Sequence, residues 1–180
     1  MQASLPFDGT HLMNWLKNLL GGRRMPALKA GTRAAHFELT SMSGEEFSLQ
    51  DALTQGPVLA VFFKISCPVC QYAMPFYERF YKAYGKQKLT IVGVSQNEKS
   101  ETAEFNKRYG ITFPVLLDDT KKFPVSNAYG LNTVPTAFWI AQDGEIEISS
   151  VSWVRQEFEE IARKAAETSG TTPKPVFQPN

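Results

Sequence analysis

The chain has 180 residues, of which 43% are hydrophobic and 21% are charged, and its formal net charge is +1. A chain of this length supports one domain with a substantial core, and this apolar content is typical of globular proteins. The small net charge and the absence of long basic runs argue against nucleic-acid binding. No apolar stretch approaches the roughly 20 residues that a membrane-spanning helix needs.

The first 25 residues are predicted to be an extension whose residues 11–20, HLMNWLKNLL, are amphipathic as a helix. Gly21-Gly22 would end that helix. Packing on the domain or on a second copy of the chain is favoured over contact with a membrane surface. The pair Arg23-Arg24 follows the apolar stretch, whereas a secretory signal places its positive charges first. We therefore expect a cytoplasmic protein, monomeric or homodimeric, with export as the alternative.

The first half of the domain is predicted to run from a hairpin into a buried strand and a long helix. A β-hairpin with a Ser-Gly turn is expected within 31–49, followed by a short helix at 49–53. Residues 58–65, VLAVFFKI, are predicted to form a buried strand, and residues 89–95 form a continuous apolar run suited to a strand covered on both faces. A helix is expected from Pro68 to about Tyr84.

The second half of the domain is predicted to alternate strands with helices and to end in a β-hairpin and a helix. Asp143-Gly144 is a strong signal for a two-residue hairpin turn, and residues 169–180 are expected to form a flexible tail unless Phe177 docks on the domain. The predicted elements are strands at 89–95, 113–119, 136–141 and 145–150, with helices at 100–109 (capped by Ser100), 125–129 and 153–168.

The only two cysteines, Cys67 and Cys70, lie between the buried strand and the long helix, separated by Pro68 and Val69. Proline is favoured at the first helical position, because the N–H that it lacks would be unpaired there. The N–H groups of Val69 and Cys70, with the helix dipole, would favour a thiolate at Cys67. In such motifs the pKa of the first thiol falls from roughly 8.5 into the range of about 3.5–7.5. Cys67 is therefore the predicted nucleophile, and Cys70 is the predicted resolving thiol.

Two prolines, the hairpin lead-in and two longer strings carry a resemblance to known families. Pro75 lies within the predicted helix and Pro135 precedes a strand. With the CxxC at a helix start, they resemble the thioredoxin superfamily, which has a helix proline at this spacing and a cis-proline facing the dithiol. The hairpin lead-in, FPVLLD at 113–118 and YGLNTVPT at 129–136 resemble the AhpC/TSA (alkyl hydroperoxide reductase/thiol-specific antioxidant) and cytochrome-maturation-type redoxins.

The resemblance covers about residues 30–167 and implies an α/β thioredoxin fold. Its domain would span 26–168, with a central mixed sheet of four or five strands flanked by helices, an N-terminal β-hairpin and an αβ insert at about 96–131. It also implies that Pro135 forms a cis peptide bond and that Val134 offers its backbone to an incoming disulfide-bearing peptide.

Thiol–disulfide exchange is the favoured activity, with a protein or small-molecule disulfide as the substrate, a thiol as the electron donor and no cofactor. A zinc site is disfavoured, because zinc needs four ligands and only His11 and His36 remain, neither of them paired with other cysteines. An AhpC/TSA-type peroxidase is the first alternative, although its Pro-x-x-x-Thr-x-x-Cys loop fits neither cysteine and no arginine lies near Pro135. A non-catalytic binding module with the same fold is the second.

The chain also departs from thioredoxin itself. Ser66 replaces the tryptophan before the first cysteine, and Val61 replaces the buried aspartate that accepts a proton from the second. Lys64 is expected to cap the strand end in water rather than to lower the pKa of Cys67, and Glu78 is expected to be a solvated helix residue. The aromatic residues at every fourth position of the long helix are expected to form a core stripe: Tyr72, Phe76, Phe80 and Tyr84.

Overall fold

The structure is a computed structural model that describes residues 26–85 and 88–177. The amphipathic segment at 11–20 and the extension that contains it therefore lie outside the described residues. Within the described ranges, no helix is long and apolar enough to cross a membrane. The cytoplasmic location with its alternative of export, the oligomeric state and the domain boundaries stay predictions.

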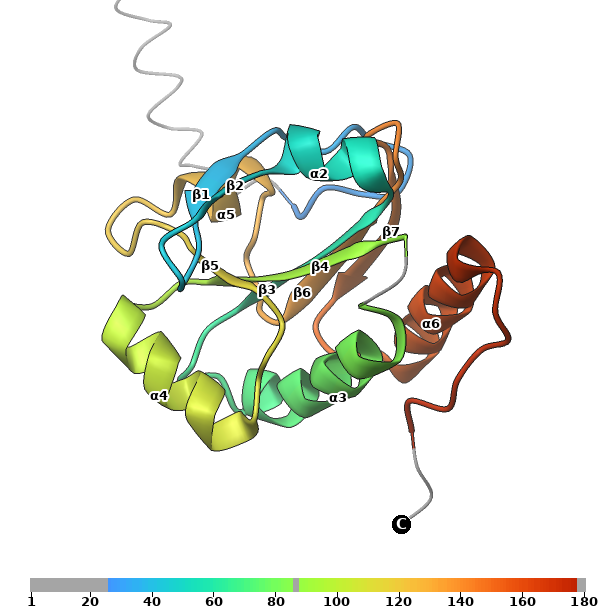
Figure 1. The fold of residues 1–180 in the computed structure, drawn as a ribbon. Coiled ribbons are helices and arrows are strands. Elements are labelled where there is room, and N and C mark those ends of the chain that lie inside the picture. The colour runs from blue at the N-terminus through green and yellow to red at the C-terminus, as the bar shows by residue number, and fades with distance from the viewer. Residues whose placement is uncertain (1–25, 86–87, 178–180) are drawn as a thin grey trace, which may run out of the picture.

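A five-stranded mixed sheet forms the centre of the fold, in the order β5-β4-β3-β6-β7 (Figure 1). The central strand β3 (Val58–Phe63) pairs in parallel with β4 (Thr90–Ser95) and antiparallel with β6 (Thr136–Ile140). All six residues of β3 are buried, as expected for a continuous apolar run with both faces covered. The edge strands are β5 (Val115–Leu117) and β7 (Ile146–Val151).

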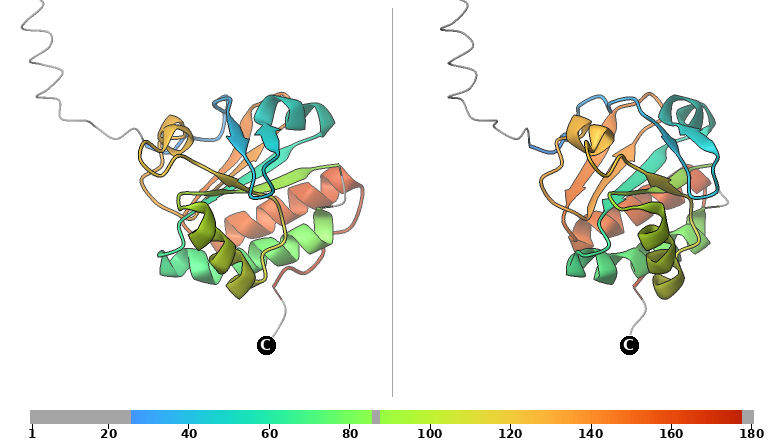
Figure 2. Two further views of the ribbon diagram at one scale, coloured as in Figure 1. Left: turned by 60° about the vertical axis from the view of Figure 1, so that its left-hand side comes forward. Right: turned by 90° about the vertical axis from the view of Figure 1, so that its left-hand side faces the viewer.

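Helices cover both faces of the sheet, and the two layers are separate in all three views (Figures 1 and 2). The lower layer in Figure 1 holds the long helix that begins at the dithiol, and the upper layer holds shorter elements. The lower elements are α3 (Pro68–Tyr84), α4 (Lys99–Tyr109) and α6 (Arg155–Ser169), and the upper ones are β1 (Glu38–Thr40), β2 (Glu46–Ser48), α2 (Leu49–Gln55) and α5 (Pro124–Ala128).

This architecture confirms the predicted fold class, including the N-terminal hairpin and the insert formed by α4, β5 and α5. The bounds of α3 agree with the prediction, while most other bounds differ by one or two residues. The predicted cap of α4 is wrong: Glu98 occupies the N-cap position, and no side chain caps this helix. Gly110 ends α4 in the left-handed conformation, with φ of 65°, as its position predicted.

Two predictions about α3 side chains are wrong. Glu78 is 4% exposed instead of solvated, because its carboxylate accepts hydrogen bonds from the backbone N–H and the hydroxyl of Thr112 at 2.7 and 2.6 Å. The aromatic stripe is core at only one end: Phe80 and Tyr84 are fully buried, whereas Tyr72 is 60% exposed.

The C-terminal segment packs against the helical layer as far as residue 177. Phe177 contacts the rings of Phe76 and Trp153 at centroid distances of 5.2 and 6.2 Å, and the preceding Val176 is buried. The Lys174 N–H also donates a hydrogen bond to the Tyr84 hydroxyl at 2.6 Å. Phe177 therefore docks on the domain, and this is the exception stated in the prediction of a flexible tail.

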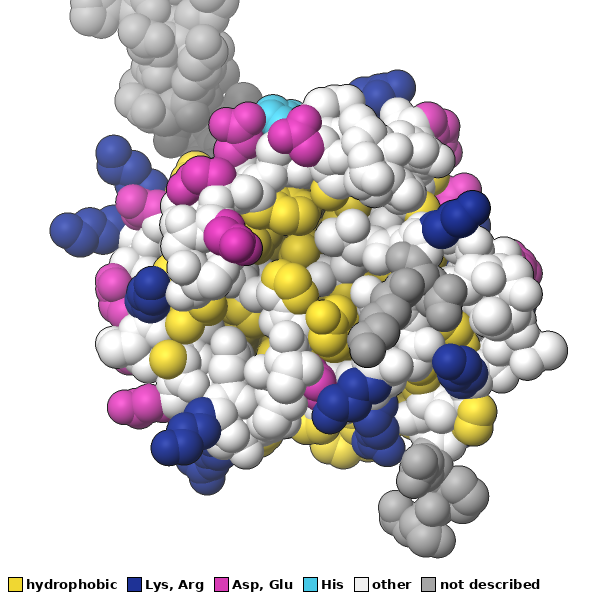
Figure 3. Space-filling model, viewed as in Figure 1, with side chains coloured by type: hydrophobic (Ala, Val, Ile, Leu, Met, Phe, Trp, Pro, Cys, Tyr) yellow, Lys and Arg dark blue, Asp and Glu magenta, His cyan; other side chains and the backbone are white. Residues whose placement is uncertain are grey.

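Charged side chains are distributed unevenly over the surface. Acidic groups gather over the β1–β2 hairpin, and several basic groups lie over the helical layer below the sheet (Figure 3). The hairpin contributes Glu38, Glu45 and Glu46, all exposed. The net charge of +1 thus averages over regions of opposite sign.

Candidate active site

Cys67 occupies the N-cap of α3, where the chain turns from the end of β3 into the helix. Its backbone is extended, with φ of −85° and ψ of 117°, and Pro68 takes the first helical position. The Cys70 N–H donates a hydrogen bond to Cys67 Sγ at 3.3 Å. Of the two amides predicted to point at the sulfur, that of Cys70 donates to it, and the described residues show no such bond from Val69.

The second side of this sulfur faces the loop before β6. The peptide bond between Val134 and Pro135 is cis, and the Cys67 thiol donates a hydrogen bond to the Val134 carbonyl oxygen at 3.2 Å. Residues 67 positions apart in sequence therefore meet at one sulfur atom. Pro135 is buried, whereas Val134 and Cys67 are partly exposed, so a partner can reach the sulfur and the adjacent backbone.

The two thiols, both free in this structure, differ in burial. Cys70 is 0% exposed, and this burial raises the pKa of its thiol, because the charged form is poorly solvated in the protein interior. A backbone hydrogen bond from Lys64 opposes the rise in the pKa, and the neighbouring Cys67 adds to it. Cys70 is consequently held as a neutral thiol beneath the accessible sulfur.

The turn that presents Cys67 is fixed by two side chains that the sequence analysis did not single out. The Ile65 N–H donates to Asn97 Oδ1 at 3.1 Å, and the Ile65 carbonyl oxygen accepts from Gln71 Nε2 at 2.9 Å. Asn97 follows β4, the parallel neighbour of β3. Polar residues just beyond the carboxyl ends of adjacent parallel strands could have indicated this contact, because those ends share one edge of the sheet.

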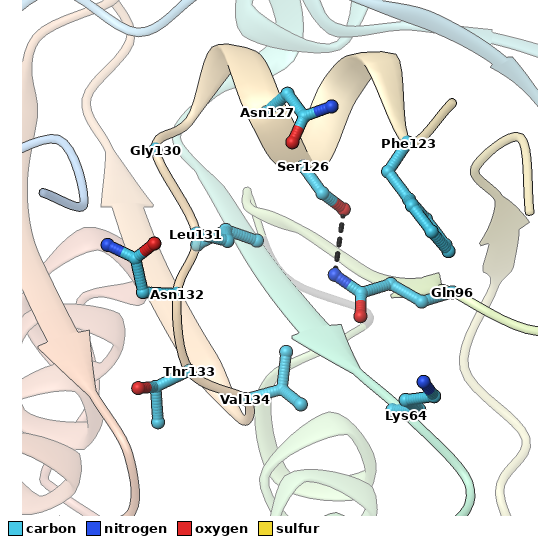
Figure 4. Close-up of a pocket in the computed structure, with 10 residues that line it drawn as sticks. All are labelled: Lys64, Gln96, Phe123, Ser126, Asn127, Gly130, Leu131, Asn132, Thr133 and Val134. Atoms are coloured by element: carbon cyan, nitrogen blue, oxygen red, sulfur yellow. Dashed lines mark hydrogen bonds between the residues drawn. The ribbon is translucent and has the colours of Figure 1, made fainter. Parts of the chain in front are cut away.

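A pocket of about 410 Å³ adjoins this turn, and Lys64 and Val134 both line it (Figure 4). The Lys64 side chain is exposed and lies on the pocket wall, which agrees with a position in water. Val69, the other residue named with the motif, is 40% exposed on the first turn of α3. The structure thus brings Cys67, Cys70 and Val134 together, whereas Val69 lies at the surface.

Comparisons with known proteins place this arrangement in a family. Residues 30–149 match the family model of the AhpC/TSA family, and the chain belongs to that family. The chain is 36% identical to thiol-disulfide oxidoreductase ResA of Halalkalibacterium halodurans over 119 residues, 66% of each chain. It is 34% identical to ResA of Geobacillus kaustophilus over 122 residues, 67% of this chain and 68% of the relative. It thus spans about two thirds of these curated relatives.

A solved structure shares the fold. A putative protein disulfide isomerase from Bacteroides thetaiotaomicron superposes with a TM-score of 0.73 over 81% of this chain and 95% of that chain, at 21% identity. The predicted resemblance to the AhpC/TSA and thioredoxin-like redoxins is confirmed. With a dithiol at the start of a helix on a thioredoxin fold, the chain is a thiol-disulfide oxidoreductase.

Proposed function

We propose that the chain reduces disulfides in proteins or small molecules, with Cys67 as the nucleophile, Cys70 as the resolving thiol and a small or protein thiol as the electron donor. One observation carries the proposal. Cys67 Sγ lies between a helix N–H donor at 3.3 Å and the carbonyl oxygen of Val134 at 3.2 Å, beside the cis-proline. An accessible sulfur is therefore held against one backbone N–H donor and beside a carbonyl oxygen along which a peptide can be aligned.

The first step is attack by the Cys67 thiolate on one sulfur of the substrate disulfide. A bond forms between the two sulfurs, the substrate S–S bond breaks, and the other substrate sulfur departs as a thiolate that takes up a proton. The Cys70 N–H, already directed at Sγ, stabilises the negative charge on the attacking sulfur, and Pro68 sets the helical geometry that directs it.

Val134 has a role in this step that its hydrogen bond explains. In the reduced protein its carbonyl oxygen accepts from the Cys67 thiol. When Cys67 loses its proton, this donor is lost and the carbonyl oxygen becomes available to a backbone N–H of the substrate. Ionisation of the nucleophile and alignment of the substrate are thereby linked, and Pro135 fixes the direction of the carbonyl group.

In the second step the Cys70 sulfur attacks Cys67 Sγ and releases the reduced substrate. Two electrons have then passed from the dithiol to the substrate disulfide, leaving a Cys67–Cys70 disulfide that a thiol donor reduces again. Cys70 must lose its proton first, and its burial opposes this. Val61 stands where thioredoxin has a carboxylate, so we assign proton removal from Cys70 as the difficult part of the cycle.

An insulin reduction assay with dithiothreitol tests the proposal. The wild-type chain should accelerate reduction above the rate of dithiothreitol alone, and Cys67→Ser should return the rate to that background. A wild-type rate equal to the background would count against the proposed activity. Peroxide consumption by the same samples tests the AhpC/TSA-type peroxidase alternative; loss of peroxide faster than loss of insulin disulfides would favour that alternative.

A further inference from the structure

The pocket beside the dithiol has walls from three parts of the chain that are distant in sequence (Figure 4). Lys64 and Gln96 follow the neighbouring strands β3 and β4, while α5 and the loop before the cis-proline form the opposite wall. Six of the lining residues define what we call the Lys64 pocket: Lys64, Gln96, Phe123, Asn127, Asn132 and Val134.

The lining of the Lys64 pocket is polar, and Lys64 is its one charged residue. Gln96, Asn127 and Asn132 also line the pocket and carry amide side chains. No carboxylate lines the pocket, and among the described residues no ion pair involves Lys64. A cation at the wall of a concave polar site, without an acidic neighbour, is suited to an anionic group on a ligand.

The opposite wall is held in a costly conformation. Phe123 has φ of 47° and ψ of 50°, the left-handed region that large side chains rarely adopt. Its neighbours fix it: the Phe123 N–H donates to the Asp119 carbonyl oxygen at 2.8 Å, and its own carbonyl oxygen accepts from Asn127 at 2.8 Å. Strain of this kind persists where the surrounding structure enforces it, and it is concentrated at binding sites.

The pocket and the reactive sulfur share one residue, Val134, as a neighbour. Val134 forms part of the pocket wall, and its carbonyl oxygen contacts Cys67 Sγ at 3.2 Å. A peptide aligned along Val134 with its cysteine at Cys67 would therefore run beside the Lys64 pocket. We propose that this pocket binds the residue next to the attacked cysteine of a peptide disulfide, and that Lys64 selects a carboxylate at that position. This inference rests on the proposed function.

Single-turnover reduction of matched peptides tests the inference. Three peptide disulfides would be compared. They differ only in the residue next to the attacked cysteine: Glu in the first, Gln in the second and Lys in the third. The reduced wild-type chain should prefer the Glu peptide over the Gln peptide by about threefold to fivefold, the range of a partly exposed ion pair. Lys64→Met should bring this ratio close to one, whereas Lys107→Met, at an exposed site on α4, should leave it unchanged. Added salt should reduce the wild-type preference.

Two results would overturn the inference. If Lys64→Met slows all three peptides equally, Lys64 acts on the thiol and not on the substrate. If the wild-type chain reduces the Glu and Gln peptides at equal rates, the pocket does not select charge. Hydroxyethyl disulfide, which is small and neutral, separates this failure from failure of the proposed function. Reduction of this disulfide without any peptide preference would remove the pocket inference alone, whereas no reduction of it would remove both.

Discussion

Cys67 and Cys70 are one helical turn apart, yet their surroundings are opposite. Cys67 is partly exposed, and its sulfur contacts two backbone groups from different segments. Cys70 is fully buried in the apolar cluster between α3 and the sheet, with Ala73 and Met74 beside it. Cys67 is the extended N-cap residue outside the helix, whereas Cys70 lies in the first turn, on the face of α3 that packs against the sheet. The boundary between the N-cap and the first helical turn therefore separates two identical side chains into an accessible thiol and a buried one.

The largest expected effect comes from removing one sulfur or the other. Cys67→Ser should lower the rate of disulfide reduction by more than about a thousandfold, as when the nucleophile of an enzyme is lost. Cys70→Ser should retain the first attack and accumulate a mixed disulfide between Cys67 and the substrate, since no second thiol releases it. Mass spectrometry of the two variants, mixed with a peptide disulfide, measures both outcomes.

The variant that carries both Cys67→Ser and Cys70→Ser is the control for this comparison, together with a check that each variant folds. Both serine variants should keep the wild-type circular dichroism spectrum, and the double variant should form no adduct. A stable adduct on Cys70 in Cys67→Ser, formed as fast as the adduct on Cys67, would show that the two sulfurs are equally accessible and would remove the basis of the assignment.

A second prediction concerns the pH dependence of the buried thiol. Burial raises the pKa of Cys70, so its thiolate fraction below that pKa increases roughly tenfold for each pH unit. In Cys67→Ser, alkylation of Cys70 by iodoacetamide should therefore keep rising past about pH 8.5, where an ordinary thiol begins to level off. Mass spectrometry across the pH range measures the rate. A plateau below that pH would mean that Cys70 ionises readily.

The same raised pKa fixes the sign of a stability effect. The folded chain holds the Cys70 proton more tightly than the unfolded chain does. Its contribution to stability is therefore complete below the pKa of the unfolded thiol and is lost as the pH rises through the folded value. Urea unfolding of the reduced protein should give a lower free energy of unfolding as the pH rises above about 8.5.

The sequence predicted the parts of this site that depend on local chemistry. Cys67 and Pro68 mark the start of α3 and Gly85 follows its end, and the predicted range of the helix agrees with the structure. The helical aromatic stripe failed for a geometric reason. A step of four residues overshoots a full turn by about 40°, so three steps rotate the stripe by about 120°. Tyr72 consequently faces solvent while Tyr84 is buried.

The remaining errors depend on contacts between distant residues. Glu78 looked like an ordinary surface residue, but Thr112, 34 positions away, supplies the hydrogen bonds that permit its burial. The contact between Asn97 and Ile65 likewise forms only when β3 and β4 pair in parallel, and the same pairing brings Lys64 and Gln96 to one pocket. No pattern within one segment records such pairings, although the shared edge of the sheet indicates where to look.

The smallest expected effect tests whether the turn that carries Cys67 is fixed independently of Cys70. Asn97→Ala removes the acceptor of the Ile65 N–H and should lower the free energy of unfolding by about 1 kcal/mol. Because Cys67 is then held less firmly, single-turnover attack on a peptide disulfide should slow by about threefold to tenfold. Alkylation of Cys70 in a Cys67→Ser background should not change.

Two matched variants separate positioning from stability. Asn97→Asp, made together with Glu101→Ala so that no second carboxylate faces it, retains an oxygen acceptor for Ile65 and should restore most of the attack rate. Glu101→Ala removes only the hydrogen bond from Asn97 Nδ2 to Glu101 at 3.2 Å and should leave the attack rate unchanged. If Asn97→Ala lowers the free energy of unfolding without slowing attack, Asn97 stabilises the fold alone. The accessibility of Cys67 would then follow from its place at the helix start, since Pro68 and the Cys70 N–H would suffice to hold it.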